Sequence, residues 1–220
     1  TAAQDNVYVA YDDFNNSDGI DRADMRIAVS LGANPPNFTR DAQAGNSLGA
    51  VNPGHRLAVD PQTGFVYSLF QRCVVNCATL AANPKTINYI LNRSTDSGQS
   101  WTLNGSATGI SVATADSTQP QPKFGTVNAL LGGVLHAAVD PVTGDVWYVY
   151  GNRDLATTNN RLAIRRLTDN GAGGLNIGTE HFVTGQVQAA IPTVAVTQNG
   201  TVGVFYYTFD GFSSDGFPIF

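Results

Sequence analysis

The chain has 220 residues, of which 42% are hydrophobic and 13% are charged, and its formal net charge is −5. This charge and the lack of a basic cluster argue against a nucleic-acid partner, and no apolar run approaches the ~20 residues that a membrane span needs. The low charge, the 23 glycines and the frequent Asn, Thr and Ser residues favour a short-stranded all-β protein over a helical one.

The first predicted unit contains an aromatic-rich strand, Asn6–Phe14, and a further strand, Met25–Ser30. The connection between them, from Asp12 to Asp24, is the densest acidic region of the chain. Asp and Asn are typical turn residues, so a solvated turn is one interpretation. The crowded oxygen ligands also make this loop a candidate Ca²⁺ site, although their spacing is not that of an EF-hand.

Similar phrases predict β-hairpins further along the chain. The segments His55–Gly64, Leu135–Gly144 and Ile191–Gly200 each precede an aromatic-rich strand, and the first two share Val-Asp-Pro-x-Thr-Gly. In those two, proline presets φ at the first turn position and glycine takes the left-handed position that closes the turn. The third ends in Asn-Gly, a strong hairpin signal. The strands that follow are predicted at Phe65–Cys73, Asp145–Asp154 and Thr201–Gly211.

Cys73 and Cys77 lie close together in Cys-Val-Val-Asn-Cys. A metal site would need more soft ligands, and the chain offers only three histidines. Free buried thiols are the other alternative. We favour a disulfide in the loop between the second and third strands of this unit, which would imply an oxidising compartment.

A third strand is predicted in each of the next units, at Thr86–Asn92 and at Arg161–Leu167. The first of these leads into Ser94-Thr95-Asp96-Ser97-Gly98-Gln99-Ser100-Trp101. We expect Asp96 to accept bonds from nearby backbone N–H groups and Gly98 to supply a positive φ. Trp101 is expected to lie buried under its own hairpin.

The pattern Ser-x-Asp-x-Gly-x-x-Trp, formed by Ser94, Asp96, Gly98 and Trp101, resembles the Asp-box (BNR repeat) of sialidases and other β-propellers. The resemblance implies an all-β, sialidase-like β-propeller with four-stranded antiparallel blades, in which Asp-boxes are structural and lie on the outer rim. A unit repeated every ~60–80 residues agrees with a repeat architecture. A β-sandwich is the alternative, but it would not explain why the hairpin phrase recurs.

We expect one propeller segment over residues 1–220, with blades at about 1–50, 51–120, 121–187 and 188–220, the last being partial. About three and a half blades are fewer than the four to eight of closed propellers. The missing blades are therefore expected from the rest of a longer chain or from a second polypeptide.

The resemblance also suggests site residues. Arg56 matches the first arginine of the Phe-Arg-Ile-Pro segment of sialidases, and Arg72 matches the arginine that ends their Ala-Glu-Gly-Arg strand. A planar guanidinium pairs two-to-two with a substrate carboxylate. The match is degraded, since His55 and Leu57-Ala58 replace Phe and Ile-Pro, and the alternative roles are a solvated arginine and a loop anchor. The acidic loop falls where sialidases carry their acid/base Asp, which makes Asp18, Asp21 and Asp24 candidates for a general acid.

Sialidases also need a nucleophilic Tyr with a Glu beside it, but the single Glu of this chain, Glu180, lies in no motif that we can match. Tyr148, Tyr150, Tyr206 and Tyr207 lie within predicted strands, where a packing role is simplest. Two functions therefore stay open: part of a sialidase-like glycoside hydrolase, or a non-catalytic propeller scaffold that binds a carbohydrate or a protein. Either would be secreted, extracellular or periplasmic, and needs no cofactor beyond the candidate Ca²⁺.

Overall fold

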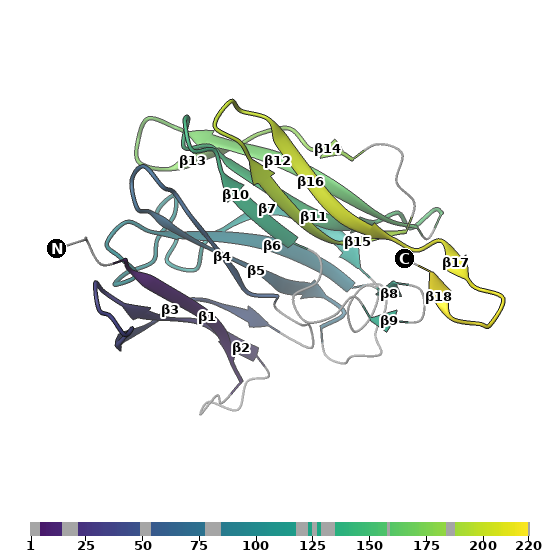
Figure 1. Cartoon of the computed structure of the whole chain (residues 1–220), viewed down its shortest axis with the longest axis horizontal. Helices are drawn as coiled ribbons and strands as arrows, with labels where there is room; N and C mark the ends of the chain where they lie inside the picture. Colours follow the sequence, from purple (N-terminus) through teal and green to yellow (C-terminus); the bar gives the residue numbers. More distant parts are fainter. Residues whose placement is uncertain are drawn as a thin grey trace.

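The computed structural model describes residues 5–14, 22–48, 54–77, 85–117, 123–124, 127–128, 135–157, 159–183 and 188–219. Within these ranges every regular element is a β-strand, and none of them contains a helix long and apolar enough to cross a membrane. All the strand pairs are antiparallel, so the all-β prediction is confirmed. Figure 1 shows the sheets arranged in chain order, from the purple N-terminal strands to the yellow C-terminal ones.

Four sheets contain most of the strands. Sheet I has β1 (Val7–Asp13), β2 (Arg22–Ser30) and β3 (Phe38–Leu48). Sheet II has β4 (Arg56–Val59), β5 (Val66–Val75), β6 (Lys85–Ser94) and β7 (Ile110–Ser117). Sheet III has β10 (Leu135–Val139), β11 (Val146–Arg153), β12 (Asn160–Asp169) and β13 (Leu175–Ile177), with β14 (His181–Phe182) also paired to β12. Sheet IV has β15 (Ala189–Val196) and β16 (Val202–Thr208).

Two short hairpins complete the described strands. One pairs β8 (Lys123–Phe124) with β9 (Val127–Asn128), and the other pairs β17 (Gly211–Phe212) with β18 (Pro218–Ile219). In sheets I and II, and from β10 to β13 in sheet III, strands that are consecutive in the chain are neighbours in the sheet, whereas β14 returns to pair with β12. Each of these runs of strands is therefore a meander, which is the simplest antiparallel topology.

The hairpin phrases form the predicted turns. Between β4 and β5, Asp60 Oδ1 accepts the backbone N–H of Gln62 at 2.8 Å, and Gly64 closes the turn at φ +71°. Between β10 and β11, Asp140 Oδ1 accepts a backbone N–H at the same offset, also at 2.8 Å, and Gly144 has φ +74°. The Asp side chain fixes the turn and the glycine adopts a conformation that L-residues rarely reach.

The sheets pack face to face in chain order, with β3 against β5, β7 against β11, and β11 and β12 against β15. Both faces of β5 are buried, because Val66 and Phe70 contribute to clusters with sheet I while Tyr67 and Leu69 contribute to the cluster with sheet III. This explains why the strand reads as a continuous apolar run rather than as an alternating one. Sheets III and IV share a further cluster that includes Val149 and Val194.

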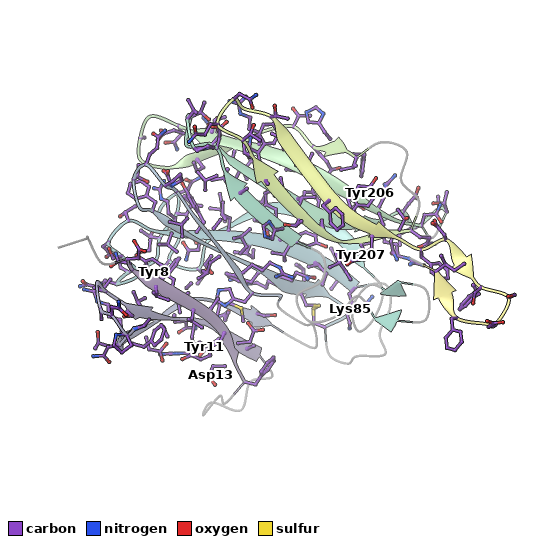
Figure 2. All side chains as sticks on the ribbon, viewed as in Figure 1. Tyr8, Tyr11, Asp13, Lys85, Tyr206 and Tyr207 are labelled. Atoms are coloured by element: carbon purple, nitrogen blue, oxygen red, sulfur yellow. A yellow bond between two sulfur atoms is a disulfide. The ribbon has the colours of Figure 1, made fainter. Side chains whose placement is uncertain are left out.

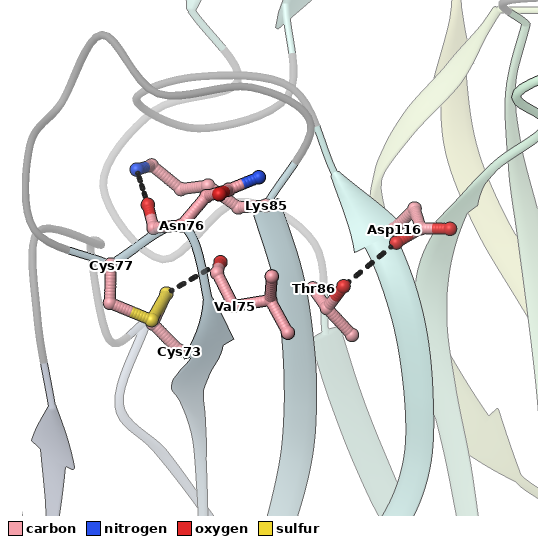
Figure 3. Close-up of a disulfide and its surroundings, with 7 residues drawn as sticks. All are labelled: Cys73, Val75, Asn76, Cys77, Lys85, Thr86 and Asp116. Carbon is pink, nitrogen blue, oxygen red and sulfur yellow. Dashed lines mark hydrogen bonds between the residues drawn. A yellow bond between two sulfur atoms is a disulfide. The ribbon is translucent and has the colours of Figure 1, made fainter.

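The predicted disulfide between Cys73 and Cys77 is confirmed, with Cα atoms 5.7 Å apart. It closes the start of the connection between β5 and β6 (Figure 3). Lys85, the first residue of β6, is almost fully buried, and its Nζ donates to the backbone carbonyl of Asn76 in this connection at 2.7 Å. The bridge and this hydrogen bond together fix the end of β5 against the beginning of β6.

Candidate functional site

The first strands of sheets II, III and IV are neighbours, because β10 contacts both β4 and β15. Their registers place one polar residue at an equivalent position of each strand, three residues before the strand ends: Arg56, His136 and Thr193. We call these residues the first-strand row. The recurrence of the hairpin phrase in the sequence thus corresponds to a recurrence of positions in space.

The first-strand row combines a cation, an imidazole and a hydroxyl. Arg56 is half-buried, and burial lowers the pKa of its guanidinium. Burial also lowers the pKa of His136, and the positive charge of Arg56 lowers it further, so the imidazole is neutral at pH 7. The Nδ1 atom of His136 accepts the backbone N–H of Val194 at 3.3 Å, which fixes the ring against sheet IV. Together these three side chains offer both hydrogen-bond donors and acceptors.

The second predicted arginine does not join this row. Arg72 Nε donates to the carbonyl of Asn46 at 3.0 Å, and Nη2 donates to the carbonyl of Thr108 at 3.2 Å. Arg72 shares a face of β5 with Phe70, whereas Arg56 pairs with Leu69 on the other face. The two arginines therefore lie on opposite faces of sheet II, and Arg72 joins sheet II to sheet I.

The acidic loop is described only at its ends. Asp18 and Asp21 lie outside the described residues. Asp24 lies within β2 rather than in a loop, where it pairs with Asp13 in register and accepts a hydrogen bond from Gln43 Nε2 at 2.8 Å. Within the part of the chain that the structure describes, no cluster of His, Cys, Asp and Glu could hold a metal ion.

A polar group that sequence reasoning missed lies between sheets I and II. His55 Nε2 is 2.8 Å from Ser68 Oγ, and His55 Nδ1 is 3.3 Å from the carbonyl of Tyr11 and 3.8 Å from Asp12 Oδ1. The order Ser–His–Asp resembles that of a hydrolase triad, but Ser68 is 0% exposed, so no substrate reaches its hydroxyl. Burial lowers the pKa of His55 to about 4 and raises that of Asp12 to about 6. The group is a buried contact between two sheets.

Sequence reasoning also missed a Tyr–Glu–Arg group on sheet III. The hydroxyl of Tyr150 donates to Glu180, and Arg165 Nε donates to the same hydroxyl at 3.2 Å. Burial and the bond to Glu180 raise the pKa of Tyr150, so the phenol is protonated at pH 7. Tyr150 packs against Tyr89 of sheet II, with ring centroids 5.0 Å apart. The group therefore lies on the face of sheet III that meets sheet II, and its phenol is not activated as a nucleophile.

The Asp-box segment forms the expected turn. Asp96 Oδ1 accepts the backbone N–H groups of Gln99 at 3.0 Å and Ser100 at 2.9 Å, and Ser100 Oγ donates to Asp96 Oδ2 at 2.6 Å. Ser94 Oγ accepts the N–H of Gly98 at 2.8 Å, and Gly98 has φ +79°. Burial opposes ionisation of Asp96, but the hydrogen bonds from Ser100, Ser94 and Gln99 outweigh it and lower its pKa to about 2.

Trp101 is only 5% exposed, as expected, but it is not buried solely under its own hairpin. It belongs to a cluster with Ile27, Val29 and Ala44 of sheet I and with Val66 of its own sheet. A Cβ atom at Gly98 would come within 2.8 Å of Val29 Cγ2, so the turn itself also lies against sheet I. The Asp-box therefore attaches sheet II to its neighbour, which corrects the local interpretation.

The equivalent turn of sheet III keeps part of this arrangement. Registers match Asp96 with Asp169 and Trp101 with Gly174. Asp169 accepts the N–H of Gly171, and Asn170 Oδ1 accepts the N–H of Gly174 at 2.9 Å. A Cβ atom at Gly174 would lie 2.3 Å from Asn104 Oδ1, so Asn104, from the connection between β6 and β7, leaves no room for a side chain at this position. The degraded sequence therefore still forms a packed turn.

The chain matches no protein-family model and no curated protein.

Proposed function

We propose that this chain is a segment of a sialidase-like Asp-box β-propeller and that it acts as a non-catalytic scaffold for a glycan or protein ligand. The first-strand row carries the proposal. In a propeller the first strand of each blade lies nearest the central axis, so the first strands of successive blades are neighbours. The contacts of β10 with β4 and β15 agree with that arrangement. So does the hydrogen bond of 3.0 Å from Gln62 in one hairpin turn to the carbonyl of Val142 in the next.

Further blades would cover the outer face of sheet IV. Val202, Val204 and Tyr206 contribute to the cluster with sheet III, so the alternating residues of β16 face the other way. Among these Phe205 is 64% exposed and lies edge-to-face with Tyr207, their ring centroids 5.9 Å apart. Figure 2 shows Tyr207 on the C-terminal sheet, far from Tyr11 on the N-terminal one. We propose that another blade, from the same polypeptide or a second one, packs on this aromatic surface.

Binding is favoured over catalysis by the positions of the arginines. A sialidase-like enzyme needs several arginines that converge on one carboxylate, and Arg56 and Arg72 lie on opposite faces of sheet II. On sheet III the Tyr150–Glu180 pair lies on the opposite face from His136, and its phenol is protonated at pH 7. The disulfide supports an extracellular or periplasmic location, because such bridges persist in oxidising compartments.

Turnover of a fluorogenic sialoside and retention on a glycan array test the proposal together. We expect glycan retention and no turnover by the purified chain, and loss of retention in Arg56→Ala. The matched control is Arg26→Ala, which removes an arginine that is bonded to Asp41 on sheet I. Turnover that is sensitive to Arg56→Ala, in this chain or in a longer protein that contains it, would establish the enzyme and overturn the scaffold.

A further inference from the structure

A pocket of about 490 Å³ lies between the Asp-box region of sheet II and the equivalent turn of sheet III. Its volume falls in the range of small-ligand sites, about 300–1,000 Å³. The pocket is separate from the first-strand row, since it is lined by the turn that joins β12 to β13 and by residues that flank the Asp-box. The lining residues used below are Phe65, Arg93, Thr95, Thr102, Asp169 and Ala172.

The walls of this pocket are fixed before any ligand arrives. Asn104, in the connection between β6 and β7, donates from Nδ2 to the carbonyl of Leu175 at 2.9 Å, and its Oδ1 accepts the N–H of Leu175 at 2.8 Å. Arg93 donates from Nη2 to the carbonyl of Gly173. These bonds tie the two turns together across the pocket. A preformed site loses little conformational entropy on binding.

The polar groups of the pocket favour a neutral ligand rich in hydroxyl groups. Asp169 is exposed and can accept from two neighbouring hydroxyls, and Thr95 and Thr102 are exposed hydroxyls that both donate and accept. Arg93 and Asp169 are the charged groups among the described lining residues, so their charges balance. An anion would meet the carboxylate, and a cation would meet the guanidinium.

The apolar wall of the pocket suits the carbon face of a sugar ring. The Phe65 ring is partly exposed, and the Arg93 guanidinium carbon lies 5.1 Å from its centroid. Arg93 is thereby held between the aromatic ring and the Gly173 carbonyl. An aromatic surface beside convergent donors and acceptors is an arrangement that recognises an amphipathic ring.

We propose that this rim pocket binds a neutral monosaccharide unit, with Asp169 and the two threonines on its hydroxyls and Phe65 against its carbon face. The choice of a saccharide rests on the proposed glycan-binding role, but the site is distinct from the first-strand row. The proposal adds a second contact point for an extended glycan, at the turns of sheets II and III.

Ligand-observed NMR and calorimetry with glucose, galactose, mannose and N-acetylglucosamine test the pocket, and N-acetylneuraminic acid serves as the charged comparison. Ala172 is exposed and its N–H is bonded to Asn170 Oδ1, so Ala172→Tyr fills the pocket without disturbing a buried residue. Ala156 occupies the same kind of turn position, bonded to Asp154 Oδ1, so Ala156→Tyr is the matched control. Asp169→Asn removes the charge but keeps an acceptor for the N–H of Gly171.

We expect saturable binding of at least one neutral sugar, loss of that binding in Ala172→Tyr, and about a tenfold weaker affinity in Asp169→Asn. Ala156→Tyr should bind like the wild type. Binding that survives Ala172→Tyr but disappears in Arg56→Ala would overturn the pocket and leave the proposed function intact. Absence of binding by every neutral sugar would also overturn the pocket, while the glycan array decides the proposed function separately.

Discussion

Replacement of Trp101 by alanine tests the inferred role of the Asp-box most simply. The ring is 5% exposed and belongs to a cluster with Ile27 and Val29 of sheet I, so its removal leaves a cavity between two sheets. Truncation of a buried large aromatic residue costs about 3–5 kcal/mol. The indole Nε1 is buried and has no hydrogen-bond partner among the described residues. The wild type therefore already loses part of the stability that burial of the ring provides. We therefore expect a loss of about 3 kcal/mol for Trp101→Ala.

Chemical denaturation followed by far-UV circular dichroism measures this loss, and a thermal scan should show a midpoint lower by roughly 6–12 °C. Trp101→Phe is the control, because it keeps an aromatic ring and removes the unpaired N–H, and its cost should stay below about 1.5 kcal/mol. A double-mutant cycle with Val29→Ala should give a coupling energy of about 0.5–3 kcal/mol, since the two residues belong to one cluster on different sheets. A Trp101→Ala variant that unfolds like the wild type would show that the ring does not stabilise the fold. A coupling energy of zero would show that the ring is stabilised by its own hairpin and not by sheet I.

The remaining predictions concern the disulfide and the buried histidine. Thiol alkylation followed by mass measurement should modify neither Cys73 nor Cys77 before reduction and both after it, because they are bridged; two modified thiols without a reductant would exclude the bridge. Burial lowers the pKa of His55 from 6.5 to about 4, so the unfolded chain binds a proton at this residue more readily than the folded one. His55 therefore lowers the free energy of unfolding as the pH falls from 6.5 to about 4. Burial raises the pKa of Asp12 from 3.8 to about 6, so Asp12 raises the free energy of unfolding as the pH falls from about 6 towards 3.8. The effects of Asp12 and His55 on stability therefore oppose each other. Asp12→Asn should therefore make the free energy of unfolding fall with acidification more steeply than in the wild type, by less than about 3 kcal/mol because solvent screens this partly exposed carboxyl, in denaturant titrations between about pH 4 and 7; a variant whose profile matches the wild type would contradict this.

Local structure could be predicted from the sequence because it depends on neighbouring residues. The turns at Asp60–Gly64 and Asp140–Gly144 follow from proline and glycine at fixed offsets, and the Asp-box turn follows from Ser94, Asp96 and Gly98 in the same way. The disulfide follows from the close spacing of its cysteines.

The faces on which side chains lie were harder to predict. Arg56 and Arg72 can be assigned to opposite faces only when the register of β4 on β5 is known, because a shift of one residue reverses the face. The turn at Asp60–Gly64 fixes which residues of β4 and β5 pair, so the sequence does contain the information needed to assign the two faces. The resemblance to sialidases aligns both arginines with a family pattern, but such an alignment does not include the alternation of side chains between the two faces of a strand.

The polar groups between sheets could not be predicted from one sequence. Tyr150 and Glu180 are 30 residues apart, and their contact depends on how the segment after β13 crosses the sheet. Asp12 lies in β1 and His55 immediately precedes β4, so they meet only through the packing of sheet I against sheet II. Such contacts are fixed by tertiary structure, for which residue spacing carries no signal.

An experimental structure of the longest natural form of this protein, with any bound polypeptide, decides between a propeller and a β-sandwich. We expect β4, β10 and β15 to surround one axis, with Arg56, His136 and Thr193 along it, and we expect another four-stranded sheet to cover Phe205 and Tyr207. A β-sandwich, in which sheets II and III form two faces of a closed core and Phe205 stays in contact with solvent, would contradict this expectation.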